Sequence, residues 1–599
     1  MPQSPRQQHN IDLVTVELLI DGSPLEDIYQ IVSVEVETCL NRIPIAIVEV
    51  LDGSPAEQNF PLSETDKLIP GKELTIKAGY HQDNEIIFKG VIVSQALKVS
   101  TDEHSRLTIK ATDKAAKMTI NRKSKTWVDS KDSDIFAQII QDHGLSSDAT
   151  ATTVTHKSVV QYQSTDWDFV LLRADLQGMV VLADQGKVSV VKPRVSGQPV
   201  LTLTYGDDIV SIDADLDART QLSEVRCSGW DHQNQQVLQE TSAAPTVNTQ
   251  GNIDGKKLAQ VLSSSPHVLA SSGAVVQSEL KVWADGRMQR AHLARIRGQV
   301  TFHGSAVVKP NSLIELKGLG ARFNGQAYVS AVRHRLSKGS WTVRATMGLS
   351  PYPFVEATDN IELPPAGGML PGVEGLHVGV VVKIHEDPDG DHRIQVKLPT
   401  VISDSEVIWA RMAHLYATNN AGSFFLPEVG DEVLLGFLSN DPRYPVILGM
   451  LYSKKHAPPY TADEKNTYKA FVSNKQMKLV FDDDKVVCHI ETPAGNKITL
   501  DDDKKTLTIV DQNGNKIELS SSGIVMDSCK DIQIKASQGK VSIEGAQGID
   551  LKSSGGDVSA EGLNVNAKGS IAFKAEGAAS AEVKSSGQTA VKGSIVMIN

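Results

Sequence analysis

The C-terminal segment of this 599-residue sequence, residues 478–599, has almost no aromatic residues. It contains no tryptophan or tyrosine, only Phe481 and Phe573, and one proline, Pro493. A single chain with so little apolar area cannot remove enough surface from water to offset the entropy lost on ordering it. We therefore expect this segment to be stable only when neighbouring copies of the chain complete its core.

Other absences exclude several classes of protein. The sequence has four cysteines without a CxxC pair, no basic cluster, and a net charge of −12. Scattered cysteines suit a reducing compartment, and an acidic chain without a basic patch is a poor partner for nucleic acid. No apolar run approaches the roughly 20 residues of a membrane helix. The N-terminus lacks the layout of a signal peptide, so we expect a protein made in the cytoplasm.

Short alternating patterns fill the C-terminal segment. Pairs of apolar residues two positions apart are separated by glycine-rich stretches, which is typical of short half-buried strands with tight corners. The pairs are Ile532/Ile534, Val541/Ile543, Ile549/Leu551, Leu563/Val565, Ile571/Phe573 and Ala581/Val583. A narrow prism of intertwined chains, most simply three, would point such pairs at a shared axis.

This pattern predicts a needle with a mechanical role. Its predicted core residues are Ile532, Ile534, Val541, Ile543, Ile549, Leu551, Ile571 and Phe573. A repeat marks its start, because residues 495–500 recur as residues 514–519, nineteen positions later. Each copy begins with Gly-Asn, which fits a turn with positive φ. We expect hairpins here, with regularly stacked strands beginning near Ile524.

Residues 11–120 read mainly as strands, because apolar and polar residues alternate in segments such as 12–20, 45–51 and 106–112. Strands are expected again from Met179 to about Met347. A linker rich in proline and glycine follows over residues 363–375, and then a compact block of strands over 377–452.

Two helices are expected between these strand-rich regions. Ser133 and Asp134 predict a cap for a helix over residues 135–140 that stops at Gly144. Residues 164–166 predict a cap for a second helix over residues 167–176 that ends at Gly178.

Four segments carry a family resemblance in the expected chain order. They are residues 167–173 with Gly178, residues 323–325 with His334, residues 425–434 with 441–449, and residues 495–500. These segments resemble, in turn, a helix motif, a hub motif, the OB-fold and the needle start of VgrG-type spike proteins. This family belongs to contractile injection systems and is related to the hub and spike proteins of contractile phage tails.

The resemblance covers nearly the whole chain but is incomplete in places. Residues 389–394 read Asp-Gly-Asp-His-Arg-Ile, where many members have a more regular strand. The linker over residues 454–475 leaves no room for the lysozyme domain that some phage spikes carry there. No fused effector is expected after Asn599.

The resemblance implies a mainly β fold. It comprises a hub of two β-barrel-like domains with a helical insertion, an OB-fold collar, and an intertwined trimeric β-helix or prism as needle. The expected domains are residues 1–120 (first hub domain), 121–180 (helical insertion), 181–357 (second hub domain), 358–375 (linker), 376–453 (OB-fold), 454–475 (linker) and 476–599 (needle).

The function implied by the resemblance is that of a homotrimeric, non-enzymatic spike. It would dock on an inner-tube protein and baseplate components, pierce the target envelope and deliver effector cargo, with transient membrane contact. The chain would be assembled into the machine and exported by contraction or released as an extracellular particle. Type VI, extracellular and phage-derived systems all stay open.

The most apolar stretch of the needle is its end. We predict that a PAAR-like tip protein covers this interface, formed by Ile595, Val596, Met597, Ile598 and Asn599. Three bare copies would expose a flat apolar facet with open strand edges. Burial of the facet within the trimer is the simpler alternative.

No catalytic or metal-binding motif stands out, so we expect no catalytic residue, cofactor or metal. Residues 318–323 lack the third glycine of GxGxxG. His377, His385 and His392 are spaced by eight and seven residues, unlike a helical zinc pair. Residues 482–484 and 501–503 are aspartate runs without the ligand spacing of a calcium loop. Solvated turns are the simpler interpretation, with a cation on a trimer axis as the alternative.

Several interpretations stay open. The helix over residues 167–173 would pack Trp167, Val170 and Leu171 on a barrel, or contact a partner. The OB block would act as a scaffold rather than bind oligonucleotides or sugars, because it is not basic. For the whole chain, the alternatives are a tail-associated peptidoglycan or glycan hydrolase and a phage-like receptor-binding fibre.

Overall fold

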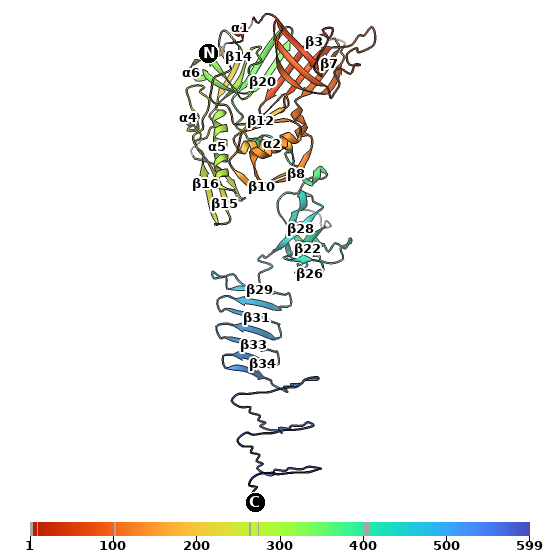
Figure 1. The fold of residues 1–599 in the computed structure, drawn as a ribbon, viewed down its shortest axis with the longest axis vertical. Coiled ribbons are helices and arrows are strands. Elements are labelled where there is room, and N and C mark those ends of the chain that lie inside the picture. The colour runs from red at the N-terminus through yellow and green to blue at the C-terminus, as the bar shows by residue number, and fades with distance from the viewer. Residues whose placement is uncertain are drawn as a thin grey trace. The chain divides into compact units, whose positions relative to one another are not determined.

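The structure is a computed structural model that describes residues 4–8, 10–100, 104–262, 265–273, 275–399 and 407–598. The chain forms two compact units, Met1–Leu451 and Tyr452–Asn599. Strands are the main regular elements of both, as Figure 1 shows. The mainly β fold expected from the sequence is confirmed.

Thirteen strands of the described part of the first unit form one large sheet. They are β1 (Val14–Ile20), β2 (Ser23–Pro24), β3 (Ile31–Cys39), β4 (Ile45–Leu51), β5 (Glu73–Tyr80), β6 (Asp83–Lys98), β7 (Arg106–Thr112), β13 (Leu201–Thr204), β14 (Ile209–Leu216), β18 (Ile296–His303), β19 (Ser312–Lys317), β20 (Gly325–Ser337) and β21 (Ser340–Met347). The main path runs β14-β18-β21-β20-β3-β4-β7-β6-β5-β1-β2, and β13 pairs with β19, which pairs with β20. The pairing of β20 with β3 places His334 opposite Val36. Strands from both expected hub domains therefore share one hydrogen-bonded sheet.

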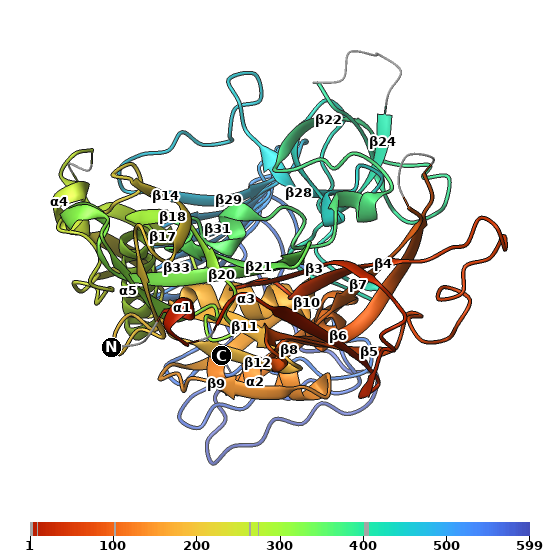
Figure 2. The same ribbon diagram turned by 90° about the horizontal axis from the view of Figure 1, so that it is seen from above.

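The expected helical insertion also contains strands. This region comprises β8 (Arg122–Lys131), α2 (Asp132–Asp142), β9 (Ser146–Ala149), β10 (Thr155–Thr165) and α3 (Asp166–Leu176), followed by β11 (Val180–Asp184) and β12 (Lys187–Val191). β8 pairs with β10, and β9 pairs with β12. Figure 2 shows α2 and α3 beside these strands, on which they pack.

One predicted helix cap is confirmed and the other is wrong. The Thr165 hydroxyl accepts a hydrogen bond from the Asp168 backbone N–H at 3.0 Å, so α3 begins as the sequence predicted. Helix α2 begins one residue before Ser133, and its N-cap Lys131 makes no side-chain cap bond. Ser133 instead donates its backbone N–H to the Thr152 hydroxyl at 3.1 Å. A long-range partner therefore replaces the local cap.

The strands expected between Met179 and about Met347 are present, but helices that the sequence did not predict interrupt them. The segment contains α4 (Gly255–Ala259) and α5 (Gln277–Leu293), next to a three-stranded sheet of β15 (Val225–Asp231), β16 (Gln236–Thr241) and β17 (His267–Ser271). Helix α5 buries polar Arg290 and His292 as well as Leu280 and Ala284. Its apolar residues do not repeat every three to four positions along one side of the helix, so the sequence does not show the pattern that predicts an amphipathic helix.

The compact block of strands forms a closed five-stranded barrel, as expected for an OB-fold. Its strands are β22 (His377–Lys383), β23 (Ile394–Lys397), β24 (Val407–Met412), β27 (Glu432–Phe437) and β28 (Pro445–Leu451), in the order β22-β23-β24-β28-β27. Val381, Val396 and Leu435 are among the buried residues that fill it. A small hairpin of β25 (Ala417–Thr418) and β26 (Ala421–Gly422) lies between β24 and β27.

The second unit contains a seven-stranded antiparallel meander, in which each strand pairs with the next along the chain. Its strands are β29 (Tyr468–Val472), β30 (Lys478–Asp482), β31 (Val487–Glu491), β32 (Lys497–Asp501), β33 (Thr506–Val510), β34 (Lys516–Ser520) and β35 (Gly523–Asp527). β29 lies inside the expected linker over residues 454–475. Intrachain pairing ends with β35; the regularly stacked strands expected from near Ile524 would involve neighbouring copies, so they stay a prediction.

The remaining helical segments are short, and they include α1 (Pro5–Gln8), η1 (Lys114–Thr119), α6 (Gly320–Phe323), α7 (Phe354–Ala357), η2 (Pro365–Gly368) and η3 (Leu438–Asn440). The sequence from Gly318 to Phe323 forms the single turn of α6 and its approach. Within the described ranges, no helix is both long and apolar enough to cross a membrane.

Candidate functional site

One face of the meander carries two parallel rows of apolar side chains. Strand register places Ile490 opposite Ile498, Ile498 opposite Ile509, and Ile509 opposite Ile517. The second row joins Cys488, Leu500, Leu507 and Leu519 in the same way. We call these eight residues the apolar face.

The apolar face is largely uncovered within one chain. Ile490 is 52% exposed, Leu500 51% and Ile509 41%. The nineteen-residue repeat explains the regularity, because residues 497 and 516 start equivalent strands after turns at Gly495 and Gly514, whose φ angles are 93° and 89°. A flat sheet with one apolar face requires a second layer to cover it.

The opposite face of the meander is polar and suits water. Glu491 lies 3.3 Å from the Lys497 ammonium and 3.5 Å from that of Lys478. The hydrogen bond from Lys497 lowers the pKa of Glu491. Thr499 and Thr508 lie opposite each other on the same face. The meander is thus two-sided, and its apolar face is the side that needs a partner.

The predicted needle core lies in a segment whose side chains are exposed to solvent in the single chain. Residues 528–598 form no strand within one chain, and Figure 1 shows them as a zigzag trace below β34. Each predicted core residue is at least half exposed, from 50% for Ile549 to 101% for Ile571. The single chain brings none of these side chains into a common core: Ile532, Ile534, Val541, Ile543, Ile549, Leu551, Ile571 and Phe573.

The predicted tip residues are also bare. Ile595 is 83% exposed, Val596 48%, Met597 87% and Ile598 89%. Asn599 lies outside the described residues. Their contact with a tip protein stays a prediction.

The aspartate runs form turns of the meander. The Asp482 carboxylate accepts the Lys485 backbone N–H at 3.0 Å, and Asp501 accepts that of Lys504 at 2.9 Å. Asp484 pairs with Lys465 at 2.8 Å. In the part of the chain that the structure describes, no cluster of three potential metal ligands occurs.

Two of the three histidines considered as ligands have separate surroundings. His377 Nε2 lies 3.0 Å from the Glu374 carbonyl oxygen, and its ring packs edge-on against Phe437. His385 lies 3.8 Å from Glu386.

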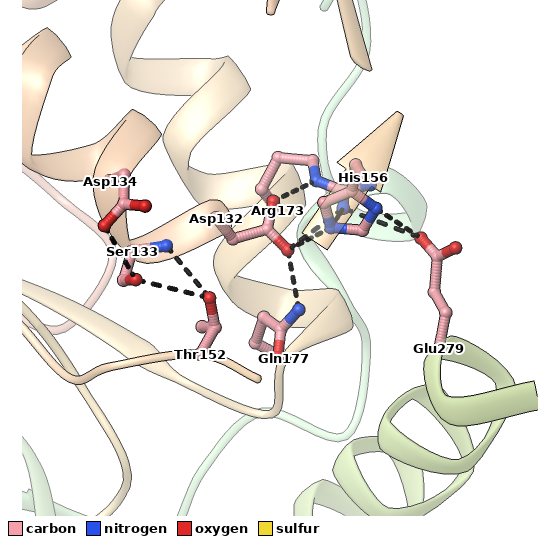
Figure 3. A network of polar contacts seen from close by, with 8 residues as sticks. All are labelled: Asp132, Ser133, Asp134, Thr152, His156, Arg173, Gln177 and Glu279. Carbon is pink, nitrogen blue, oxygen red and sulfur yellow. Dashed lines mark hydrogen bonds and ion pairs between the residues drawn. The ribbon is translucent and has the colours of Figure 1, made fainter. Parts of the chain in front are cut away.

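A buried polar network, which sequence analysis missed, joins three helices and a strand (Figure 3). Arg173 of α3 donates two hydrogen bonds to Asp132 at the start of α2, at 2.7 and 3.0 Å. Gln177 donates a third at 2.6 Å, and His156 Nε2 of β10 lies 3.0 Å from the same carboxylate. Glu279 of α5 lies 3.6 Å from Arg173.

The electrostatics of this network favour an ion pair that holds elements together. Burial of Asp132 opposes its ionisation, but hydrogen bonds from His156 and Arg173 outweigh burial and lower its pKa to about 2. The carboxylate is fully buried, so it offers no surface to a substrate. Trp167, Val170 and Leu171 are buried beside it, as predicted for a packing helix. The only sequence signal of the network was Arg173, within the family-like helix motif.

Three family models match the chain. They are described as Alg8 N-terminal domain (residues 10–338), type VI secretion system/phage-baseplate injector OB domain (377–452) and phage baseplate V C-terminal trimerisation domain (487–599). The first covers more than half of the chain, and the second matches the closed barrel described above.

Curated relatives agree with these models. The type VI secretion system spike protein VgrG4b of Pseudomonas aeruginosa is 33% identical over 117 residues, which cover 18% of this chain and 14% of that protein. VgrG3 of Vibrio cholerae is 31% identical over 106 residues, covering 16% and 10%. The chain belongs to the VgrG-type spike family.

Solved structures with similarity to this VgrG-type chain include tail and secretion proteins. The 43 kDa tail protein of prophage MuSo2 from Shewanella oneidensis has a TM-score of 0.42 at 12% identity, covering 56% of this chain and 98% of that one. The E. coli c3393 protein, a component of the type VI secretion system, has a TM-score of 0.34 at 13% identity, covering 72% and 99%.

The segment that matches the trimerisation domain contains both exposed apolar surfaces of the VgrG-type chain. It begins at the first residue of β31 and includes β31 to β35 and the segment beyond Asp527. The apolar face and the predicted needle core therefore both lie within a segment whose family description is trimerisation.

Proposed function

We propose that this chain forms a homotrimeric spike at the tip of a contractile injection machine. The observation that carries the proposal is the uncovered apolar face of the meander, in a segment that matches a trimerisation domain. Three copies, each with its apolar face turned to a common axis, make a closed prism with a polar exterior.

The energetics favour this assembly. Covering the exposed half of an Ile or Leu side chain contributes on the order of 1 kcal/mol. The apolar face offers seven Ile and Leu side chains per chain besides Cys488. Five of them are 36–52% exposed, and residues 528–598 add many more exposed ones. This gain is large enough to exceed the loss of translational and rotational freedom on association.

The mechanical role follows from the trimer. Strands stacked at about 4.8 Å along an axis form a rod held by continuous backbone hydrogen bonds, and such a rod transmits a push along its length. The first unit would dock on an inner-tube protein and baseplate components, and the needle would pierce the target envelope in transient contact with its membrane. Effector cargo would travel with the spike, which contraction exports or the cell releases within a particle.

We also propose that the role is structural rather than enzymatic. The buried network around Asp132 has no substrate access. The name of one relative, actin cross-linking toxin VgrG1 of Vibrio cholerae, describes that protein, of which this chain covers 10%. Among the described residues, no observation favours a hydrolase or a receptor-binding fibre.

Sedimentation of the purified full chain, combined with negative-stain microscopy, tests the proposal. We expect a trimer with a long thin projection. A folded monomer at micromolar concentration would contradict it.

The tip interface has its own test. A full chain lacking residues 593–599 should remain trimeric but lose binding of a PAAR-like protein in a pull-down. The matched control replaces Lys592 with alanine and should keep binding, because Lys592 lies outside the apolar tip. Unchanged binding after the deletion would refute the tip interface.

A further inference from the structure

The segment that leaves the large sheet is held by charged side chains. It follows β21 and covers residues 350–361. We call this stretch the exit segment, and we call the part of the chain before it, residues 14–347, the hub. The exit segment begins the connection from the hub to the barrel, whose first strand starts at His377.

The start of the exit segment is fixed by a buried ion pair. Arg290 of α5 donates hydrogen bonds to the carbonyl oxygens of Ser350 and Tyr352, at 3.2 and 3.4 Å. Arg290 also pairs with Asp175 of α3, and the Asp175 carboxylate accepts the backbone N–H of Phe354. Both charged side chains are about nine-tenths buried, so salt screens this contact little.

The end of the exit segment is held by Arg122 of β8. The Arg122 guanidinium donates hydrogen bonds to the carbonyl oxygens of Asn360 and Ile361, both at 2.6 Å. It donates another to the Gln163 carbonyl oxygen of β10 at 3.1 Å. A planar guanidinium holds several acceptors in a fixed geometry, whereas a lysine ammonium acts as a point charge on a flexible stem. We call Arg122 and Arg290 the clamps.

The second half of the connection is fixed to the barrel. The turn η2 (Pro365–Gly368) packs on η3 (Leu438–Asn440), and Val373 donates its backbone N–H to the Asn440 carbonyl at 2.8 Å. Ala366 of η2 is only 2% exposed and has a φ of 52°. A residue other than glycine keeps such a conformation only where the surrounding contacts enforce it.

Three residues, Glu362, Leu363 and Pro364, lie between the part held by the hub and the part held by the barrel. Pro364 has a φ of −56° and a ψ of 144°, close to the polyproline II conformation. The following residue is also proline, and each proline fixes its own φ and restricts the residue before it. The three residues therefore act as a short, semi-rigid spacer of roughly 9 Å.

We propose that residues 350–373 form a strap that couples the hub to the barrel, with the two clamps as its positioning residues. The inference rests on the proposed spike, because coupling matters where the hub must pass a push on to the needle. A flexible linker over residues 358–375 would span roughly 23 Å in any direction, so a push would bend the joint. The strap leaves only the spacer between two anchored ends.

Proteolysis of the full chain tests the clamp at Arg122. The bond between Glu362 and Leu363 is exposed, and a glutamate-specific protease cleaves it when the chain around it can enter the active site. Mass spectrometry of timed samples measures the fragments 1–362 and 363–599. We expect Arg122→Ala to raise the cleavage rate at this bond at least tenfold and Arg122→Lys to raise it less.

The matched control is Lys125→Ala, because Lys125 lies on the same strand and its ammonium lies 3.8 Å from the centre of the Trp127 ring. It should be cleaved at the wild-type rate. Equal rates in Arg122→Ala and Lys125→Ala would overturn the clamp.

Negative-stain images of the full-length trimers test the coupling. The angle between the hub and the thin projection should vary little in wild type, and its spread should at least double when Arg122→Ala is combined with Pro364→Gly. The control combines Lys125→Ala with Pro388→Gly in an exposed barrel loop and should keep the wild-type spread. Bending between barrel and needle is common to all these chains, so the difference reports the strap.

Sedimentation of the same samples separates the two proposals. A trimer whose angle keeps the wild-type spread in the strap variant overturns the coupling and leaves the spike intact. A wild-type monomer contradicts the trimeric spike itself, and the cleavage rates, which need no trimer, then still decide whether the clamp exists.

Discussion

Ile498 of β32 and Ile509 of β33 lie directly opposite each other on the apolar face, and each keeps about two fifths of its surface exposed, 39% and 41%. Directly behind them, on the other face of the same two strands, Thr499 pairs with Thr508. Residues 508 and 509 are therefore neighbours in the chain that point to opposite faces of the meander. They give a matched pair for testing which face is covered.

Ile509→Lys should abolish the trimer. Three ammonium groups would be brought together away from water, and the penalty for burying an unpaired charge is several kcal/mol per ion. Sedimentation of the full chain should show a monomer or an aggregate in place of the trimer.

The control is Thr508→Lys, which places the same charge on the polar face opposite Glu518. It should sediment as wild type. Trimers of equal stability in both variants would show that the apolar face is not the contact surface.

The meander should be sufficient for trimerisation without the segment that follows it. A chain ending at Asp527 keeps all seven strands and the complete apolar face. We expect it to remain trimeric, with a lower thermal midpoint than the full chain, whereas a chain ending at residue 467 should be monomeric. If the 1–527 chain is also monomeric, the bare segment over residues 528–598 holds the copies together instead.

Local signals in the sequence predicted local structure. The cap at Thr165 and the apolar pattern of α3 lie within one short segment, so the helix could be read directly. The Gly-Asn repeat likewise predicted hairpins, and these became β31 to β34. The order of barrel and needle followed from the family-like motifs.

Structural features that depend on contacts between residues far apart in the sequence could not be predicted from the sequence. Arg173 and Asp132 are 41 residues apart in the chain, and nothing in either neighbourhood indicates their pairing. Helix α5 was missed because it is buried on several sides. Gly178 and Gly286 let α3 and α5 meet, since a Cβ on Gly178 would lie 2.7 Å from the Gly286 Cα. For the predicted needle core the partners lie in other copies, so those residues stay predictions.

Arg173→Ala should destabilise the first unit strongly. It leaves the Asp132 carboxylate buried without its bidentate partner, and breaking a buried pair in this way typically costs about 3–5 kcal/mol. Urea unfolding followed by tryptophan fluorescence should show the loss, since Trp167 lies in the same core cluster as α2 and α3.

Arg226→Ala is the matched control, because Arg226 and Glu224 form a pair that is about 40% exposed on both sides. Surface pairs contribute about 0–1 kcal/mol, so this variant should unfold nearly as wild type. Similar losses in both variants would argue against a special role for the buried network.

His334 should make the stability of the large sheet depend on pH. Its ring is buried in β20 beside Trp341, with ring centres 6.0 Å apart, and its Nδ1 has no hydrogen-bond partner among the described residues. Burial lowers the pKa of His334 from 6.5 to about 4.

Because His334 has the higher pKa in the unfolded chain, the unfolded chain binds this proton first as the pH falls. Stability is therefore lost progressively between about pH 6.5 and pH 4. Because a shift of one pKa unit corresponds to about 1.36 kcal/mol, the loss in free energy of unfolding amounts to about 3 kcal/mol. His334→Phe, which keeps an aromatic ring but cannot bind a proton, should remove this part of the pH dependence. Urea midpoints of both proteins at pH 7 and pH 4.5 measure it, and parallel pH profiles would show that His334 is not the group that titrates.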